Sequence, residues 1–287
     1  MVRITTDSTA DLNADFEKYD IGVLPLNVIL DGESYLDGVS ITPEDIYAKY
    51  KEKKILPKTA ARSPEDFKAF FEQYTNAGDE VVHINISSKI SMTHENAKKA
   101  ASELKGVYVV DSLSLSSGTG LLVLYAAELA QKGLSAKEIA ELVSRRVPHV
   151  QTSFVVDTME YLHKGGRCSS LARIAATVLR IKPSIVMTDG EMSVGKKYMG
   201  SFDKVIVKYV EETLGKWNTP DLTRIFITHT SASPDTVAKV RDKIKEIAPF
   251  AEIKETIASS TITSHCGKGT LGILYINDGD KKLSELK

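Results

Sequence analysis

Residues 81–94 read VVHINISSKISMTH, a short apolar run that leads straight into a turn rich in hydroxyl side chains. The run from Val81 to Ile86 predicts a strand, and the turn after it is placed to begin a helix. Backbone N–H groups at the start of a helix lack partners within the helix and lie at the positive end of its dipole. Ser91 and Thr93 therefore either bind an anion together with these groups, such as a carboxylate or a phosphate, or simply cap the helix.

Short strands and longer helices alternate on both sides of this stretch, which indicates an α/β fold with a mostly parallel sheet in the first half of the chain. The predicted strands are Val2–Thr6, Ile21–Leu30, Val81–Ile86 and Val107–Val110. The predicted helices are Thr42–Lys53, Ser63–Tyr74, Leu121–Lys132 and Ala136–Arg146. The first two begin with a hydroxyl N-cap, a proline and two acids. The third is strongly apolar, so we expect it to be buried between a sheet and another layer.

The pattern restarts after Pro148, which predicts a domain boundary near Gln151 and two domains, residues 1–150 and 151–287. The dipeptide Asp189-Gly190 predicts a tight hairpin turn in the second domain. The strands predicted there are Ser153–Asp157, Ser184–Thr188, Met192–Lys196, Arg224–Thr228, Glu252–Thr256 and Leu271–Asn277, and the helices are Met159–His163, Leu171–Arg180, Phe202–Gly215 and Ser233–Ile247. This order predicts a mixed sheet with helices packed on it.

Composition excludes several classes of function. The chain has 287 residues, of which 42% are hydrophobic and 26% charged, so it can bury a sizeable core. Its 37 basic and 38 acidic residues give a net charge of -1, which disfavours a nucleic-acid binder. Cys168 and Cys266 are too far apart in sequence for a CxxC pair, and a reduced compartment suits them best. Because we find neither a signal peptide nor an apolar run of roughly 18 residues, we expect a soluble, cytoplasmic protein.

Sequence motifs argue against a cofactor. Gly267–Gly272 matches GxGxxG, but it precedes a predicted strand instead of following one, so a dinucleotide site is rejected. Walker A, HExxH, GxSxG and zinc-ligand spacings are all missing from the sequence. The six histidines are scattered along the chain, so we expect no metal site. What remains is a set of polar turns.

These polar turns follow predicted strands or precede predicted helices. They are Asp7–Leu12, Lys58–Pro64, Asp111–Gly118 and Ser264–Gly267, in addition to the turn at Ser91. In an open parallel sheet, ligands bind beyond the carboxyl ends of the strands, where the turns of the first half are expected to gather. The turns are either parts of a ligand site or a row of ordinary helix caps. His265 either faces the same crevice from the second half or is a structural loop histidine.

Several motifs, in this order and spacing, resemble those of the DegV family of bacterial fatty-acid-binding proteins over essentially the whole chain. The matching segments are Asp7–Leu12, Thr59–Phe67, Ser87–Thr93, Asp111-Ser112, Tyr161–Arg167 and His265–Gly269. The resemblance implies a two-domain α/β fold with a long-chain fatty acid in an apolar tunnel between the domains. The chain departs from the family at Met92, where relatives usually have glycine, and this side chain could narrow the tunnel mouth.

The resemblance also implies which residues hold the ligand. In the family a Thr, a Ser and a His bind the carboxylate, and they correspond to Thr59, Ser91 and His265. Two hydroxyls and an imidazole N–H can satisfy a carboxylate withdrawn from water. Thr93 and Ser117, in the neighbouring polar turns, are further candidate ligand-binding residues. Burying roughly 14 methylenes at about 0.8 kcal/mol each contributes on the order of 11 kcal/mol before ordering costs.

The family's role is that of a carrier and not of an enzyme. Its bound acid is presented to a separate ATP-dependent fatty acid kinase, becomes an acyl phosphate and is used in phospholipid synthesis. The resemblance suggests that Arg167 faces the phosphorylation site or the kinase; the alternative is a solvated cation after a helix that ends at Gly165-Gly166. The run from Lys196 to Ser201 is less basic than is usual in the family, which favours lipid binding over coupling to a kinase.

Two other functions remain open from the sequence. Ser91 with His265 as base, and Asp7 or Asp111 to orient the histidine, would make a hydrolase or an acyltransferase acting on acyl esters. No nucleophile-elbow sequence supports this hypothesis. The third is a binder of some other small anion.

Overall fold

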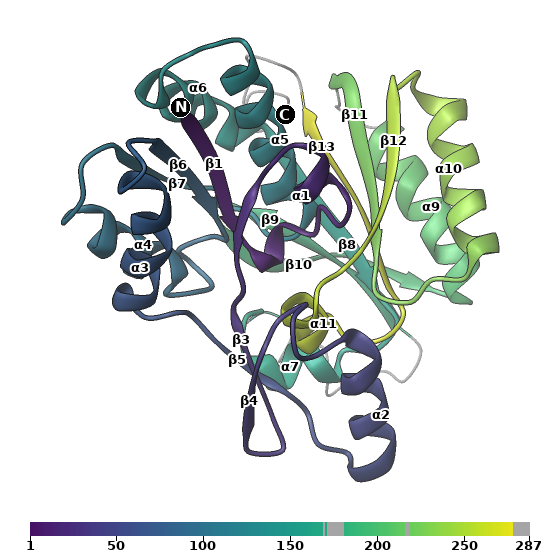
Figure 1. Ribbon diagram of the computed structural model, residues 1–287. Helices are drawn as coiled ribbons and strands as arrows, with labels where there is room; N and C mark the ends of the chain where they lie inside the picture. The colour runs from purple at the N-terminus through teal and green to yellow at the C-terminus, as the bar shows by residue number, and fades with distance from the viewer. Residues whose placement is uncertain (169, 171–180, 216–218, 278–287) are drawn as a thin grey trace.

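The computed structural model describes residues 1–168, 170, 181–215 and 219–277, and the predicted α/β fold is confirmed. The first half contains a four-stranded sheet in the order β2-β1-β6-β7 (Figure 1). Its strands are Gly22–Leu24, Val2–Asp7, Glu80–Asn85 and Val107–Asp111, and each neighbouring pair is parallel. The carboxyl ends of β1, β6 and β7 therefore lie at one edge of the sheet, as the alternating pattern predicts.

Helices cover both faces of this sheet. On one face lie α3 (Pro64–Thr75) and α4 (Thr93–Ala101), whose apolar side chains pack on Val81. On the other lie α5 (Ser117–Gln131) and α6 (Ala136–Arg146), which pack on Val82 and Ile84. Because consecutive side chains of a strand point to opposite faces, an apolar strand such as β6 serves both layers. The short segments α1 (Asp15–Lys18), η1 (Ser8–Ala10) and η2 (Val147–His149) connect these elements.

The prediction of one strand from Ile21 to Leu30 is wrong. The chain breaks at Pro25, which has no N–H for a sheet, and the next N–H, of Leu26, donates to Ser8 Oγ at 3.1 Å. The remainder becomes β3 (Asn27–Leu30), which lies in a separate antiparallel sheet between β4 (Glu33–Leu36) and β5 (Lys58–Ala60). With α2 (Pro43–Lys53) these strands form the lower lobe of Figure 1. β4 and β5 are not predicted from the sequence.

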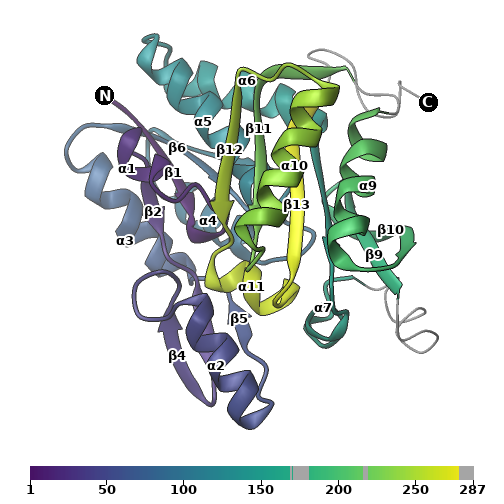
Figure 2. The ribbon, with the colours of Figure 1, turned by 90° about the vertical axis from the view of Figure 1, so that its right-hand side faces the viewer.

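The second half is built on a mixed sheet, as predicted, and its six strands lie in the order β10-β9-β8-β13-β11-β12. Only β11 and β12 pair in parallel; the other neighbours are antiparallel. The strands are β8 (Val150–Val156), β9 (Ile181–Thr188), β10 (Glu191–Met199), β11 (Pro220–His229), β12 (Glu252–Ile257) and β13 (Thr270–Asn277). Helices α9 (Phe202–Gly215) and α10 (Pro234–Ile247) pack on this sheet through an apolar cluster (Figure 2).

The described part of the second half also contains two short helices. They are α7 (Glu160–Gly165) and α11 (Ser260–Cys266), and α11 was expected to be a turn. Its sequence is rich in β-branched residues, which have low helix propensity, so periodicity alone does not reveal it. The helix predicted over Leu171–Arg180 lies outside the described residues.

The two halves share a core. Helix α5 is buried on nearly every side, as expected from its apolar sequence, and its cluster includes Phe226, Leu274 and Ile276 of the second sheet. It contacts both β1 and β13. The domain boundary near Gln151 stays a prediction. In the described part of the chain, no helix is long and apolar enough to span a membrane.

Candidate functional site

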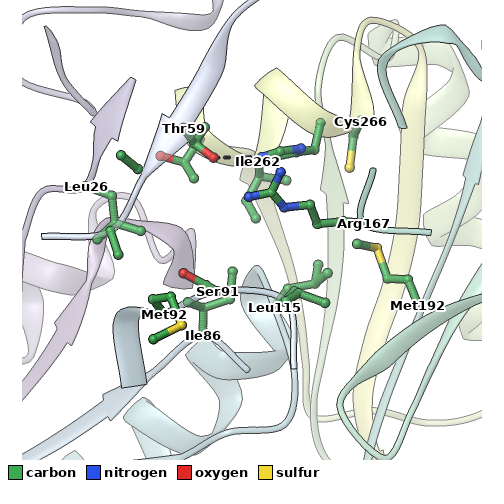
Figure 3. A pocket seen from close by; sticks show the side chains of 15 residues that line it. Leu26, Thr59, Ile86, Ser91, Met92, Leu115, Arg167, Met192, Ile262 and Cys266 are labelled. Carbon is green, nitrogen blue, oxygen red and sulfur yellow. Dashed lines mark hydrogen bonds between the residues drawn. The ribbon is translucent and has the colours of Figure 1, made fainter. Parts of the chain in front are cut away.

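A cavity of about 260 Å³ lies where loops of the first half meet α11 and β10 of the second (Figure 3). Most of its wall is apolar, from Leu26, Ala60, Ala61, Ile86, Ile90, Met92, Leu115, Met192, Ile262 and Cys266. The polar members of the wall are Thr59, Ser91, Arg167, Thr261 and His265. A mainly apolar wall with a few convergent polar groups is typical of a small-molecule site.

Thr59 and His265 form a hydrogen bond across the two halves. Thr59 lies on β5, where it pairs with Val28, and its Oγ1 is 2.8 Å from Nε2 of His265 on α11 (Figure 3). Burial, with a smaller effect of the Arg167 charge, lowers the pKa of His265 from 6.5 to about 4. The imidazole is therefore neutral at pH 7, and the pair offers a hydroxyl and a ring nitrogen to a ligand.

The other side of the His265 ring is in contact with backbone. Its Nδ1 is buried and has no hydrogen-bond partner among the described residues. A Cβ atom placed on Gly165 of α7 would lie only 2.5 Å from this nitrogen. The ring therefore packs directly on a glycine. Sequence reasoning gave Gly165 as a helix breaker and as part of a family-like segment, and did not predict this contact.

Ser91 precedes Met92, the N-cap of α4, and its side chain both bonds to the first helical residue and lines the cavity. Its Oγ accepts the backbone N–H of Thr93 at 3.2 Å and lies 2.8 Å from Thr93 Oγ1. The turn before it is held by Ser87, whose Oγ donates to Gly190 O at 2.7 Å in the β9–β10 hairpin. The two sequence interpretations of Ser91 are thus compatible, because a hydroxyl oxygen has two lone pairs and one proton.

Two further candidates lie elsewhere. Thr93 is fully buried and bonded to Ser91, and Ser117 is fully buried with its Oγ on Thr228 of β11. Neither is among the described residues that line the cavity. Both side chains point into the protein interior. Their places in polar turns of the sequence did not predict this direction. Arg167 does line the cavity, and its Nη1 donates to Gly165 O at 2.7 Å.

Thr261 is a wall residue that sequence reasoning missed. It is buried, and no group in the described ranges pairs with its Oγ1. It precedes His265 by four positions, so both lie on one face of α11. The four-residue spacing could have predicted that Thr261 lies beside His265, but only if the segment had first been identified as a helix.

The motif Asp7–Leu12 does not contribute to the described wall of the cavity. Asp7 accepts the N–H groups of Thr9 and Ile86, and burial raises its pKa. Burial also raises the pKa of Asp11 to about 8. The motif therefore ties loops together. Among the described residues no group of three or more His, Cys, Asp or Glu side chains could hold a metal ion.

Comparison with known proteins gives a consistent assignment. A DegV domain-containing protein from Caldanaerobacter subterraneus subsp. tengcongensis is 32% identical over 279 residues, which cover 96% of this chain and 98% of the relative. A DegV family protein from Thermus thermophilus, whose structure is described as fatty acid binding, is 30% identical with a TM-score of 0.88 and covers 96% of this chain and 99% of its own. A Thermotoga maritima structure, described as revealing fatty acid binding function, is 30% identical with a TM-score of 0.83 and the same coverage. The model of the family described as "Uncharacterised protein, DegV family" matches residues 1–278, and the chain belongs to the DegV family.

Proposed function

We propose that the protein is a carrier that binds one long-chain fatty acid in the cavity between its halves, with the carboxylate at Thr59, His265 and Ser91. The observation that carries the proposal is the Thr59–His265 hydrogen bond, which places a neutral polar pair in a mainly apolar wall. The relatives from Thermus thermophilus and Thermotoga maritima that are described as fatty acid binding support the same ligand class.

A neutral socket is suited to a carboxylate. The hydroxyls of Thr59 and Ser91 can donate to the carboxylate oxygens, and the ring of His265 can donate or take up a proton. A buried cationic side chain opposite the carboxylate would be unpaired in the absence of ligand, and an unpaired buried charge destabilises the protein. Arg167, on the exposed side of the wall, supplies positive charge without burying it.

The cavity must widen to hold a whole acyl chain. Its 260 Å³ lies below the roughly 300–1,000 Å³ of typical ligand pockets. A second cavity of about 20 Å³ shares the wall residues Leu115, Ile262 and Cys266 with the first. We propose that movements of these three side chains join the two spaces, and that the acyl tail enters along this route.

Lipid extraction tests the ligand. Protein purified from bacteria should release about one acyl chain per molecule in mass spectrometry, and delipidated protein should bind palmitate or oleate. Thr59→Val should weaken binding by about tenfold or more, because a charge-assisted hydrogen bond contributes about 1.5–3 kcal/mol. Thr263→Val is the matched control: Thr263 is a buried threonine on α11, the helix of His265, but it is not among the described wall residues. Repeated recovery of empty protein that binds neither acid would refute the proposal.

We further propose that the bound carboxylate is presented to a fatty acid kinase, for use in phospholipid synthesis, and that Arg167 serves this step. Arg167 is exposed and lies in the wall beside His265, so it can reach both the headgroup and a docked partner. In an assay with a bacterial fatty acid kinase and ATP, Arg167→Ala should abolish acyl-phosphate formation and retain palmitate binding. Equal loss of both activities would assign Arg167 to ligand binding alone.

A Ser91–His265 hydrolase is the weaker candidate. In the described part of the chain no hydrogen bond joins these two residues, since the Nε2 of His265 pairs with Thr59 and the Oγ of Ser91 pairs with Thr93. Hydrolysis of an acyl ester that is lost in Ser91→Ala would favour the enzyme over the carrier.

A further inference from the structure

Helix α11 carries His265, but a helix this short needs contacts with the rest of the protein to stay in place. It has seven residues, and a helix of this length is not stable in isolation. Its first backbone N–H groups have no partners within the helix. The placement of His265 therefore depends on whatever receives those groups.

The N–H of Ile262 is received by Ser259 Oγ, the N-cap of α11 itself, at 3.3 Å, whereas the two N–H groups before it are received by a side chain of the first half of the chain. Asp37, in the loop after β4, is 2% exposed and lies beyond the N-terminus of α11. Its Oδ1 accepts the N–H of Ser260 at 2.8 Å, and its Oδ2 accepts the N–H of Thr261 at 3.2 Å. Oδ2 also accepts the hydroxyl of Ser8 at 2.8 Å. Both oxygens of this carboxyl group are thus used by donors.

Asp11 receives the preceding amide. Its Oδ1 accepts the N–H of Ser259 at 2.9 Å, and its Oδ2 is bonded to the hydroxyl of Ser116 at 2.5 Å. A hydroxyl can donate or accept, whereas a backbone N–H only donates. An amide side chain could therefore replace Asp11, with its oxygen on Ser259 and its NH₂ on Ser116, but the same replacement at Asp37 would turn an NH₂ toward a donor.

We infer that Asp37 is a positioning residue for the ligand site: by receiving the first N–H groups of α11, with Asp11 beside it, it sets the place of the His265 ring against Thr59. Thr261 and His265 are four residues apart, about 6 Å along the helix axis. A tilt or slide at the clamped end is transmitted over this distance to the ring. The inference rests on the proposed function where ligand affinity is the measurement, but not where the ring itself is observed.

The experiment compares two isosteric changes in the full chain. Asp37→Asn should weaken binding of palmitate by about tenfold or more and shift the NMR signals of the His265 ring in the ligand-free protein. Asp11→Asn should leave affinity within about threefold, because its hydrogen bonds can be kept. Glu138→Gln, which changes a carboxylate that caps α6, controls for loss of a charge at a helix start. A substitution in the core away from the cavity, for example at Ile244, chosen so that its melting temperature equals that of Asp37→Asn, controls for lost stability.

A double-mutant cycle separates positioning from general damage. If Asp37 acts through the Thr59–His265 pair, Asp37→Asn should cost little further affinity in a Thr59→Val background. Additive losses, or unchanged affinity and His265 signals in Asp37→Asn, would overturn the inference. If Asp37→Asn does not fold, Asp37→Glu keeps both oxygens but displaces them by one methylene, and the same signals must shift. If wild type binds no fatty acid while the His265 signals still respond to Asp37→Asn, the carrier function fails and the positioning role stands.

Discussion

At the scale of single residues, we expect His265 to make the proposed binding of a fatty acid depend on pH. Its pKa in the empty site is about 4, because burial disfavours the imidazolium. A carboxylate beside the ring favours the charged form, so binding should raise this pKa and take up a proton. Calorimetry near pH 5, in buffers of different ionisation enthalpy, should show proton uptake on palmitate binding. His265→Gln should remove the part due to the ring, and equal uptake in both proteins would contradict the prediction.

Burial of another histidine, His83, makes the stability of the protein depend on pH. The His83 side chain is fully buried against the rings of Phe67 and Phe71, with Nδ1 2.9 Å from Thr5 Oγ1 and an Nε2 that pairs with none of the described residues. Burial lowers its pKa from 6.5 to about 3. The unfolded chain therefore binds a proton that the folded protein does not between these two pH values.

The titration of His83 makes the free energy of unfolding fall as the pH falls. The stability that the neutral His83 ring provides is complete above pH 6.5 and decreases by about 1.4 kcal/mol per pH unit as the pH falls towards 3. His83→Phe should reduce the slope of unfolding free energy against pH by about this amount in that window. Urea unfolding of both proteins at several pH values measures it. Parallel curves would show that His83 does not titrate as its burial implies.

At the scale of elements, Gly165 links α7 to α11. In Gly165→Ala the new Cβ would lie 2.5 Å from Nδ1 of His265 and push the ring away from Thr59, although alanine favours the helix. We expect palmitate affinity to fall by about tenfold with little change in melting temperature. Gly215→Ala is the control, because no described atom outside its own helix and chain neighbours lies within 4 Å of the new Cβ. Equal affinity in the two variants would contradict the prediction.

The elements also show what could be read from the sequence. The spacing of hydrophobic residues and the capping residues were enough to predict β6, α2 and α3, because local interactions define these elements. They failed at Pro25, where one apolar run serves two sheets, and at α11, which the carboxyl groups of Asp11 and Asp37 hold. Thr59 and His265 are 206 positions apart, and no rule based on local sequence relates residues at that separation. Their contact was therefore expected only from the resemblance to the family.

At the scale of the whole molecule, we expect exchange of the proposed ligand to involve a movement of the two halves apart at the cavity. One contact that holds them is the tip of the β9–β10 hairpin, where Gly190 O accepts the hydroxyl of Ser87 in the loop before Ser91. A Cβ on Gly190 would come within 2.7 Å of Ser87 Oγ and 2.9 Å of both Leu113 and Lys89 side chains. This hairpin tip therefore packs so closely on the cavity loop that only glycine fits.

The chain contains a matched pair of turns with which to test this contact. Asp31-Gly32 and Asp189-Gly190 are both tight hairpin turns, with φ of 87° at Gly32 and 85° at Gly190, so alanine strains both backbones alike. The new Cβ at Gly32 would meet no described atom within 4 Å. Gly190→Ala should therefore release a fluorescent fatty acid several-fold faster than Gly32→Ala in stopped-flow exchange, although both variants lose a similar amount of backbone stability. Equal release rates would mean that the hairpin tip does not hold the cavity closed, and that exchange is controlled by contacts on the α11 side.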